Sequence, residues 1–192
     1  TESYSPDLKV LGSDISKKVK LADAVIVSDY GKGFVTNQLL GIVSENARFL
    51  SIDPKPSRLL QYANPDLLTP NRFEALELAG LSRESCDPFP QEDVVGKIFE
   101  KFAPKMLAVT LGADGMLLAT DGKIDKIIPT FAKEVFDVSG AGDTVIAALT
   151  LGLIGEQNFA EAAEFANLAA GVVVGKVGTA TVSPEEILGL VN

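Results

Sequence analysis

The sequence predicts a three-layer α/β fold, with helices on both faces of a mostly parallel sheet. Short apolar runs rich in β-branched residues alternate with longer segments of helical spacing, which is typical of such folds. Late in the chain, Asp121-Gly122 separates two strand-like runs and is a strong signal for a two-residue β-hairpin turn. This hairpin would add antiparallel strands at one edge of the sheet. The 192 residues contain no repeat, low-complexity tract or linker, so we expect one domain.

Six runs are predicted to be strands because they are short, apolar and rich in β-branched residues. In chain order they are residues 24–28, 48–52, 66–68, 106–110, 115–120 and 123–128. The first four are followed by polar or charged groups: Ser28-Asp29-Tyr30, Asp53-Pro54-Lys55, Thr69-Pro70-Asn71 and Thr110-Leu111-Gly112. In open α/β sheets, ligands bind at the carboxyl ends of the strands, so we expect the chemistry of this protein at that edge.

Apolar residues recur with helical spacing in six segments, which are predicted to be helices. The segments are residues 36–47, 72–79, 91–102, 142–155, 159–174 and 184–191. Thr36 is expected to cap the first of them, because a threonine side chain can accept a hydrogen bond from a backbone N–H of the first turn. Residues 81–90 show no such pattern and are predicted to form a loop.

The composition narrows the class of protein. A net charge of −9 argues against a general nucleic-acid surface, which would need basic patches. The longest apolar runs fall far short of a membrane span, and no signal-peptide pattern opens the sequence. The single cysteine, Cys86, cannot form an internal disulfide, which suits a reducing compartment. We therefore expect a cytoplasmic protein that binds neither nucleic acid nor a membrane.

The sequence contains no histidine, which excludes a Ser-His-Asp triad, a Cys-His pair and a histidine zinc site. Proton transfer must then fall to Asp, Glu, Lys, Tyr or Cys. Because the protein is acidic, an anionic substrate would have to be held by local devices such as a helix N-terminus, a nest of backbone N–H groups, a few lysines and a cation.

The segment 137–144 carries the clearest chemical signal. Gly140, Ala141 and Gly142 leave the backbone uncovered where a helix is predicted to begin, so successive N–H groups can point at one anion. Asp143 falls in the first turn beside them. A carboxylate there could accept a proton from a substrate hydroxyl while the N–H groups hold a phosphoryl group.

Three other interpretations apply to a segment of this kind. A capped helix start, with Asp143 serving only the helix dipole, explains the pattern as well on local grounds. A Rossmann dinucleotide loop is disfavoured because the segment follows a hairpin, and Glu161, about twenty residues further, falls inside a predicted helix. A P-loop is excluded because no Gly-x-x-x-x-Gly-Lys-[Ser/Thr] run exists.

Four segments, in order, resemble the PfkB/ribokinase family of carbohydrate kinases. They are Asn71 with Glu74, Thr110-Leu111-Gly112 with Gly115, residues 137–144, and residues 165–171. The resemblance runs from about residue 20 to the end of the sequence and implies a ribokinase-like fold. Within the family, residues 28–33, 52–55 and 171–179 look most like the kinases that phosphorylate heptose 7-phosphate in ADP-heptose and lipopolysaccharide synthesis. Kinases for ribose, fructose or a nucleoside are the alternatives.

The resemblance implies that Asp143 deprotonates the acceptor hydroxyl and that residues 140–142 stabilise the transferred phosphoryl group. ATP and Mg²⁺ are the implied cofactors. Asn71 and Glu74 would act on the magnesium–phosphate network, and water would bridge them to the ion. The alternative for Asn71 and Glu74 is an ordinary helix N-terminus with a favourable early glutamate.

Further residues receive roles at the nucleotide by the same resemblance. Thr110, Gly112 and Gly115 would lie at the nucleotide phosphates, whereas a strand-ending turn is the alternative. Asn167 would lie near the adenine, and an exposed helical asparagine is the alternative. Lys55 is expected to contact a phosphate because it follows a strand end between two prolines; a solvated lysine is the alternative.

The remaining expectations concern the acceptor and a second cation. Asp29, Tyr30 and Lys32 are expected to face the sugar or its phosphate. Asp137 and Ser139 would help to form a monovalent-cation site for K⁺, although local turn capping explains them equally well.

Family members carry a substantial N-terminal portion that is missing from this sequence. The resemblance therefore implies that residues 1–192 are the C-terminal nucleotide-binding and catalytic portion, with most of the acceptor site outside it. A nucleotide-binding module without catalysis is the competing hypothesis. The sheet is expected to have an exposed edge, at which copies of the chain can aggregate or pair as a homodimer. A nucleotidyltransferase domain, fused or separate, is a further expected partner.

Overall fold

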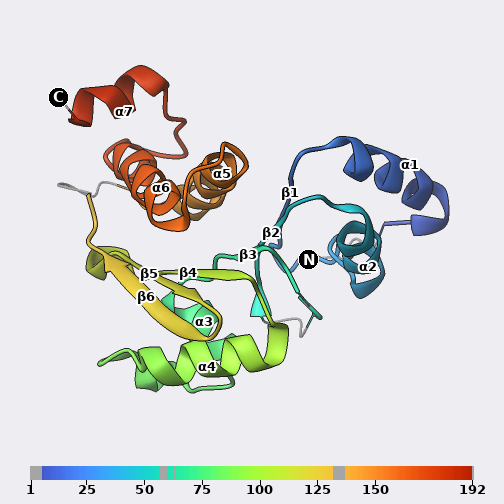
Figure 1. Ribbon diagram of the computed structural model, residues 1–192, viewed down its shortest axis with the longest axis horizontal. Coiled ribbons are helices and arrows are strands. Elements are labelled where there is room, and N and C mark those ends of the chain that lie inside the picture. Colours follow the sequence, from blue (N-terminus) through green and yellow to red (C-terminus); the bar gives the residue numbers. More distant parts are fainter. Residues whose placement is uncertain (1–5, 57–59, 63, 132–136, 192) are drawn as a thin grey trace.

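The computed structural model describes residues 6–56, 60–62, 64–131 and 137–191. In this described part, a six-stranded sheet has the order β1-β2-β3-β4-β5-β6 (Figure 1). The strands are β1 (Val25–Ser28), β2 (Leu50–Asp53), β3 (Leu67–Leu68), β4 (Met106–Thr110), β5 (Met116–Thr120) and β6 (Lys123–Ile128). Neighbours pair in parallel from β1 to β4 and antiparallel from β4 to β6. The predicted mostly parallel sheet with an edge hairpin is confirmed.

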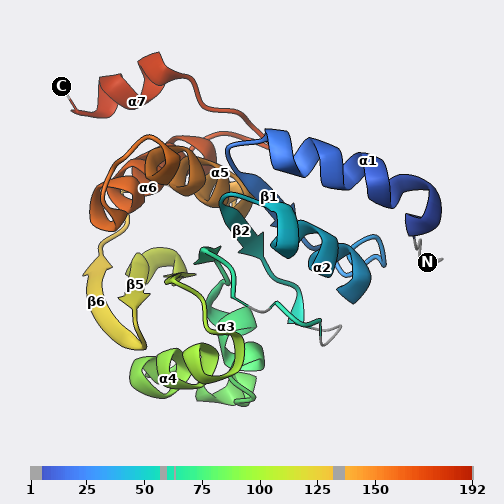
Figure 2. The same cartoon turned by 45° about the vertical axis from the view of Figure 1, so that its right-hand side comes forward.

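Helices cover both faces of the sheet (Figure 1). Helices α2 (Asn37–Asn46), α3 (Arg72–Leu78) and α4 (Gln91–Phe102) pack on one face, and α5 (Ala141–Ile154) and α6 (Phe159–Val174) pack on the other. Outside these layers, α1 (Leu8–Leu21) packs on α2, and α7 (Pro184–Val191) packs on α6 (Figure 2). The six predicted helices are all present, within one or two residues of the predicted bounds.

Consecutive residues of a strand pack into the hydrophobic cores on opposite faces of the sheet. In β3, Leu68 belongs to the core under α2–α4, while Leu67 belongs to the core under α5 and α6, and both are fully buried. Leu117 and Leu118 of β5 divide in the same way. Because successive side chains alternate across a strand, a sheet covered on both faces needs continuous apolar runs. Truncating one of these leucines to alanine would cost about 2–5 kcal/mol.

Helix α5 is fixed over the sheet by a buried hydroxyl pair. Ser51 of β2 and Thr150 of α5 lie 2.6 Å apart, and neither side chain reaches solvent. A buried hydroxyl without a partner is costly, so this pair favours one position of α5 on β1 and β2. The N-terminal turn of α5 thereby lies at the carboxyl ends of those two strands.

Three elements of the described chain were not predicted. The first is helix α1, whose N-cap Asp7 accepts a hydrogen bond from the N–H of Lys9 at 3.0 Å. The other two are short 3₁₀ helices: η2 (Arg83–Cys86), within the predicted loop 81–90, and η3 (Gly112–Asp114), after β4. The expected open edge is present, because β1 has no partner on its outer side in the described chain and Ile26 is 42% exposed there. Among the described helices, none is both long and apolar enough to cross a membrane.

Candidate active site

The N-terminus of α5 forms an anion-binding turn. Its N-cap, Gly140, adopts a left-handed backbone with a φ of 81°, and its carbonyl accepts from the N–H and the hydroxyl of Thr144 at 3.0 and 2.9 Å. The N–H of Ala141 donates to the carbonyl of Val138 at 3.2 Å. As far as the described residues extend, the N–H groups of Gly142 and Asp143 donate no hydrogen bond. Two free donors and the positive end of the helix dipole therefore favour an anion here.

Asp143 projects from this turn toward the end of β1. Its carboxylate accepts from the hydroxyl of Tyr30 at 2.9 Å (Oδ1) and 2.8 Å (Oδ2), and from Ser28 Oγ at 3.3 Å. The hydrogen bond to this carboxylate is the main cause that raises the pKa of Tyr30 above its usual value. Asp143 is exposed, so it can accept a hydrogen bond from a hydroxyl of a ligand.

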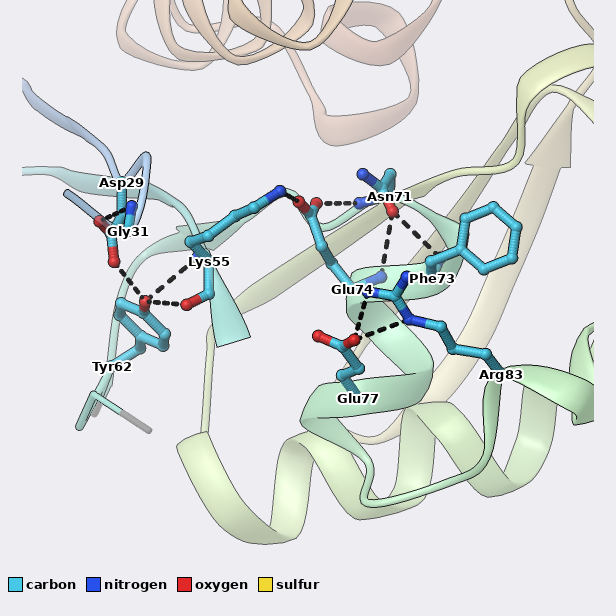
Figure 3. Close-up of polar contacts among 9 residues, drawn as sticks. All are labelled: Asp29, Gly31, Lys55, Tyr62, Asn71, Phe73, Glu74, Glu77 and Arg83. Atoms are coloured by element: carbon cyan, nitrogen blue, oxygen red, sulfur yellow. Dashed lines mark hydrogen bonds and ion pairs between the residues drawn. The ribbon is translucent and has the colours of Figure 1, made fainter. Parts of the chain in front are cut away.

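Lys55, Glu74 and Asn71 form a chain of polar contacts at the ends of β2 and β3 (Figure 3). Lys55 Nζ donates to Glu74 Oε1 at 2.9 Å, and the N–H of Asn71 donates to Glu74 Oε2 at 3.0 Å. The Asn71 side chain in turn accepts from the N–H groups of Phe73 and Glu74. The Asn-x-x-Glu motif is thus a capping box, and Glu74 raises the pKa of Lys55.

Asp53 was not among the predicted site residues, yet it stands between the two groups. It ends β2 and pairs with Ser28 of β1 in the parallel register. Burial, together with the negative charges of Glu74 and Asp143, raises the pKa of Asp53 from 3.8 to about 7. A carboxyl group with such a pKa at the ligand-binding edge is typical of a functional position. The sequence signal was its place as the first polar residue after a buried strand.

These carboxyl groups fit a hydrated magnesium ion. Among the described residues, no three His, Cys, Asp or Glu side chains gather into a direct metal site. Asp53 and Glu74 instead repel one another at a distance, which is one cause of the raised pKa of Asp53. Mg²⁺ keeps several of its waters and often takes only one or two carboxylates. A hydrated cation between Asp53 and Glu74 would relieve this repulsion.

The predicted acceptor residues divide into two kinds. Asp29 is 5% exposed, and its carboxylate accepts from the N–H of Gly31 at 2.8 Å and the hydroxyl of Tyr62 at 2.9 Å (Figure 3). Its oxygens therefore join the loop after β1 to the segment after β2. Tyr30 and Lys32 are exposed and border a hollow of about 410 Å³, whose other lining residues include Phe34.

Asn71 and Thr110 lie side by side, because the two residues form a parallel β-bridge. Beyond Thr110, Gly112 has a φ of 65° and open space where a side chain would stand, so a ligand can approach its backbone. Gly115 differs, because a Cβ there would lie 1.9 Å from the carbonyl oxygen of Ile128. Glycine is therefore required at position 115, because any side chain there would collide with the end of β6.

Asn167, Asp137 and Ser139 have protein partners. Asn167 is buried, unlike the exposed asparagine of the alternative, and donates to the carbonyl of Pro129 at 2.6 Å, which fixes the chain after β6 to α6; its place near the adenine stays a prediction. Asp137 accepts from the N–H groups of Ser139 at 2.9 Å and Gly178 at 3.2 Å, and these hydrogen bonds lower its pKa. The turn-capping alternative is thus present in the structure, while the K⁺ site stays a prediction.

The fold therefore brings together one group around Asp143 and a second around Glu74, with Asp53 between them. The first group contains Ser28 and Tyr30 from the end of β1. The second contains Lys55 and Asn71 from the ends of β2 and β3, next to Thr110 of β4. Both groups lie along one edge of the sheet. Together they contain groups that can hold a phosphoryl group, take a proton and attract a cation.

The chain resembles known proteins over nearly its whole length. It matches the pfkB family of carbohydrate kinases over residues 14–186. It is 40% identical over 190 residues to the bifunctional protein HldE of Sulfurimonas denitrificans, an alignment that covers 97% of this chain and 39% of that protein. The HldE of Geobacter sulfurreducens is 43% identical over 171 residues, or 87% and 34% of the two chains. The chain thus spans about two fifths of these relatives or less.

Solved structures show the same fold. Ribokinase from Giardia lamblia superposes with a TM-score of 0.80 at 23% identity and covers 95% of this chain and 63% of its own. Ribokinase from Thermotoga maritima gives a TM-score of 0.77 at 24% identity, with 92% and 59% covered. The fold is therefore ribokinase-like, as the sequence predicted. With the family match over residues 14–186, these findings show that the chain belongs to the pfkB family of carbohydrate kinases.

Proposed function

We propose that this chain is the nucleotide-binding and catalytic portion of a kinase that transfers a phosphoryl group from ATP to a sugar hydroxyl. The single observation that carries the proposal is the first turn of α5. There the Asp143 carboxylate already accepts hydroxyl hydrogen bonds, beside the unused N–H groups of Gly142 and Asp143 itself. A base for the acceptor and donors for the phosphoryl group thus belong to one rigid helix end.

The chemistry follows from this arrangement. The acceptor hydroxyl gives its proton to Asp143 as its oxygen bonds to the γ-phosphorus of ATP, and the bond from that phosphorus to the β–γ bridging oxygen breaks. The Gly142 and Asp143 N–H groups hold the oxygens of the transferred group, and ADP leaves. Asp53 and Glu74 would hold hydrated Mg²⁺, which when bound neutralises phosphate charge.

The acceptor in the proposal is D-glycero-D-manno-heptose 7-phosphate, phosphorylated on its anomeric hydroxyl to the 1,7-bisphosphate. Residues 28–33 and 52–55, which resemble heptose-7-phosphate kinases, form the ends of β1 and β2 around Asp143 and Asp53. The similar HldE proteins are called bifunctional, which supports a joined nucleotidyltransferase activity in the whole protein. Asp137 and Ser139 are proposed for K⁺ on the resemblance to the family alone.

A second candidate function is a nucleotide-binding module without its own turnover. One observation favours it: the hollow at the end of β1 is lined only by residues between Ser28 and Val35 in the described chain. A sugar phosphate needs more partners than Tyr30 and Lys32 to be oriented for reaction.

Two measurements separate the candidates. Calorimetry would measure ATP binding with and without Mg²⁺, and an ADP-release assay would follow turnover with heptose 7-phosphate, ribose or fructose 6-phosphate. The kinase proposal predicts Mg²⁺-dependent ATP binding to this chain and, in the complete enzyme, ADP release that depends on heptose 7-phosphate. ATP binding by the chain with no sugar-dependent release by the complete enzyme supports the binding module, and the absence of ATP binding contradicts both.

A further inference from the structure

We propose that Tyr30 occupies the place of the acceptor hydroxyl on Asp143 and that the acceptor must displace it to bind. The inference rests on the proposed function, because it takes Asp143 as the base of the transfer. It assigns to this chain a residue that competes with the acceptor and so determines how readily the base is reached. No other side chain of the described residues contacts both oxygens of the Asp143 carboxylate.

The Tyr30 hydroxyl contacts Asp143 in the way that the hydroxyl of a sugar substrate would. The Tyr30 hydroxyl lies 2.9 Å from Oδ1 and 2.8 Å from Oδ2, so it is within hydrogen-bond distance of both carboxylate oxygens. A sugar hydroxyl has to donate the same hydrogen bond to the same carboxylate before the base can take its proton. Ser28 Oγ is more distant, 3.3 Å from one oxygen, and is the weaker partner. The phenol and an acceptor hydroxyl therefore compete for one position.

Tyr30 is placed where it can leave without disturbing the core. Its side chain is 62% exposed, and it lies on the loop between β1 and α2. Asp29, in contrast, is buried and tied to Tyr62, so the base of the loop is fixed while the ring of Tyr30 stays at the surface. The hollow of about 410 Å³ at the end of β1 is bordered by Tyr30, Lys32 and Phe34, and a ligand in it would lie against the phenol that contacts Asp143.

The contact itself is tested first, without any acceptor. Tyrosinate absorbance is followed against pH for the unchanged chain, Tyr30→Phe and Asp143→Asn; the component lost in Tyr30→Phe identifies Tyr30 among the three tyrosines. We expect Tyr30 to titrate above its usual value of about 10 in the unchanged chain and to return toward that value in Asp143→Asn. The same titration in both proteins would overturn the proposal, whatever the protein phosphorylates.

The competition is then measured with heptose 7-phosphate as the probe, by calorimetry on the complete enzyme that contains this chain. Loss of the phenol hydroxyl in Tyr30→Phe should tighten binding by about threefold to tenfold, since one charge-assisted hydrogen bond no longer has to be broken. Ser44→Ala is the control, because it removes an exposed hydroxyl of α2 that donates to the Gly41 carbonyl and is not part of the hollow. The affinity of Ser44→Ala for heptose 7-phosphate should stay near that of the unchanged protein.

Equal or weaker binding by Tyr30→Phe would overturn the proposal. So would the absence of binding to Tyr30→Phe, because Tyr30 would then not be the group that excludes the acceptor. ATP binding, measured on the same samples, reports on the proposed function separately. A chain that binds ATP with Mg²⁺ but shows no gain in Tyr30→Phe keeps the kinase proposal and loses only the role of Tyr30.

Discussion

The ammonium group of Lys55 donates a 2.9 Å hydrogen bond to the nearly buried carboxylate of Glu74, which closes a contact between the ends of β2 and β3. The other oxygen of Glu74 caps α3 through the N–H of Asn71 (Figure 3). The Glu74 carboxylate thus stabilises the start of α3, and it is also the group that we propose for the magnesium–phosphate network. Substitutions can separate the two tasks.

We predict that Glu74→Gln raises the Mg²⁺ concentration needed for half-maximal ATP binding roughly tenfold. Glutamine can still bond back to the N-cap, so the free energy of unfolding should fall by no more than about 1 kcal/mol. Glu77→Gln is the control, because Glu77 lies on the same helix but pairs with Arg83. An unchanged Mg²⁺ titration in Glu74→Gln would remove Glu74 from the network.

Asp53 should make the stability of the protein depend on pH. Because its pKa is raised in the folded state to about 7, folding favours its protonated form, so its contribution is present below about pH 4 and is lost as pH rises toward 7. In the unchanged protein, the free energy of unfolding should therefore fall between pH 5 and pH 8. Urea denaturation at these two pH values should show that Asp53→Asn makes this fall smaller by roughly 1–3 kcal/mol. Asp23→Asn, a change at an exposed surface carboxylate, is the control and should leave the decline intact.

The Ser51–Thr150 pair is predicted to fix α5 energetically. Thr150→Val should lower the free energy of unfolding by about 1–3 kcal/mol, because it leaves the buried Ser51 hydroxyl without its 2.6 Å partner. Ser51→Ala in addition should restore part of that loss. A double-mutant cycle by chemical denaturation measures the coupling, and additive effects would show that the hydroxyls do not depend on each other.

Gly115 is predicted to be required for the fold rather than for the nucleotide. A Cβ at this position would collide with the Ile128 carbonyl, so Gly115→Ala should cost about 2–4 kcal/mol of unfolding free energy in a denaturation series. Gly96→Ala is the control: a Cβ at this helical position in α4 would meet open space, so this change should be neutral or slightly stabilising. Equal stability of the two variants would contradict the packing assignment.

The sequence predicted most of the fold because local signals and tertiary structure agree. Thr36 caps α2 as expected, and Asp121 and Gly122 both have the positive φ that a tight hairpin turn needs. Helix α1 was missed although Leu11, Ile15 and Val19 recur at helical spacing, because the rest of the helix is mainly polar and only Gly12 and Val19 are buried.

The site was predicted less completely, because several of its properties arise only when distant segments meet. The raised pKa of Asp53 comes from burial and from Glu74 and Asp143, neither of which is near it in the chain. Asp29 was expected at the sugar, and the structure adds that one oxygen of its carboxylate accepts a hydrogen bond from Tyr62, which is 33 residues away in the chain. Motif spacing identifies residue types and strand ends, whereas partners of this kind depend on packing.

The role of Asp143 is tested most directly by comparing the unchanged protein with Asp143→Asn, with ATP affinity and sugar-dependent ADP release measured on both. Because the carboxylate acts mainly in the transition state, we predict that turnover in the complete enzyme falls by at least about a hundredfold while ATP affinity stays within about twofold. Near-normal turnover in Asp143→Asn would contradict its assignment as the base.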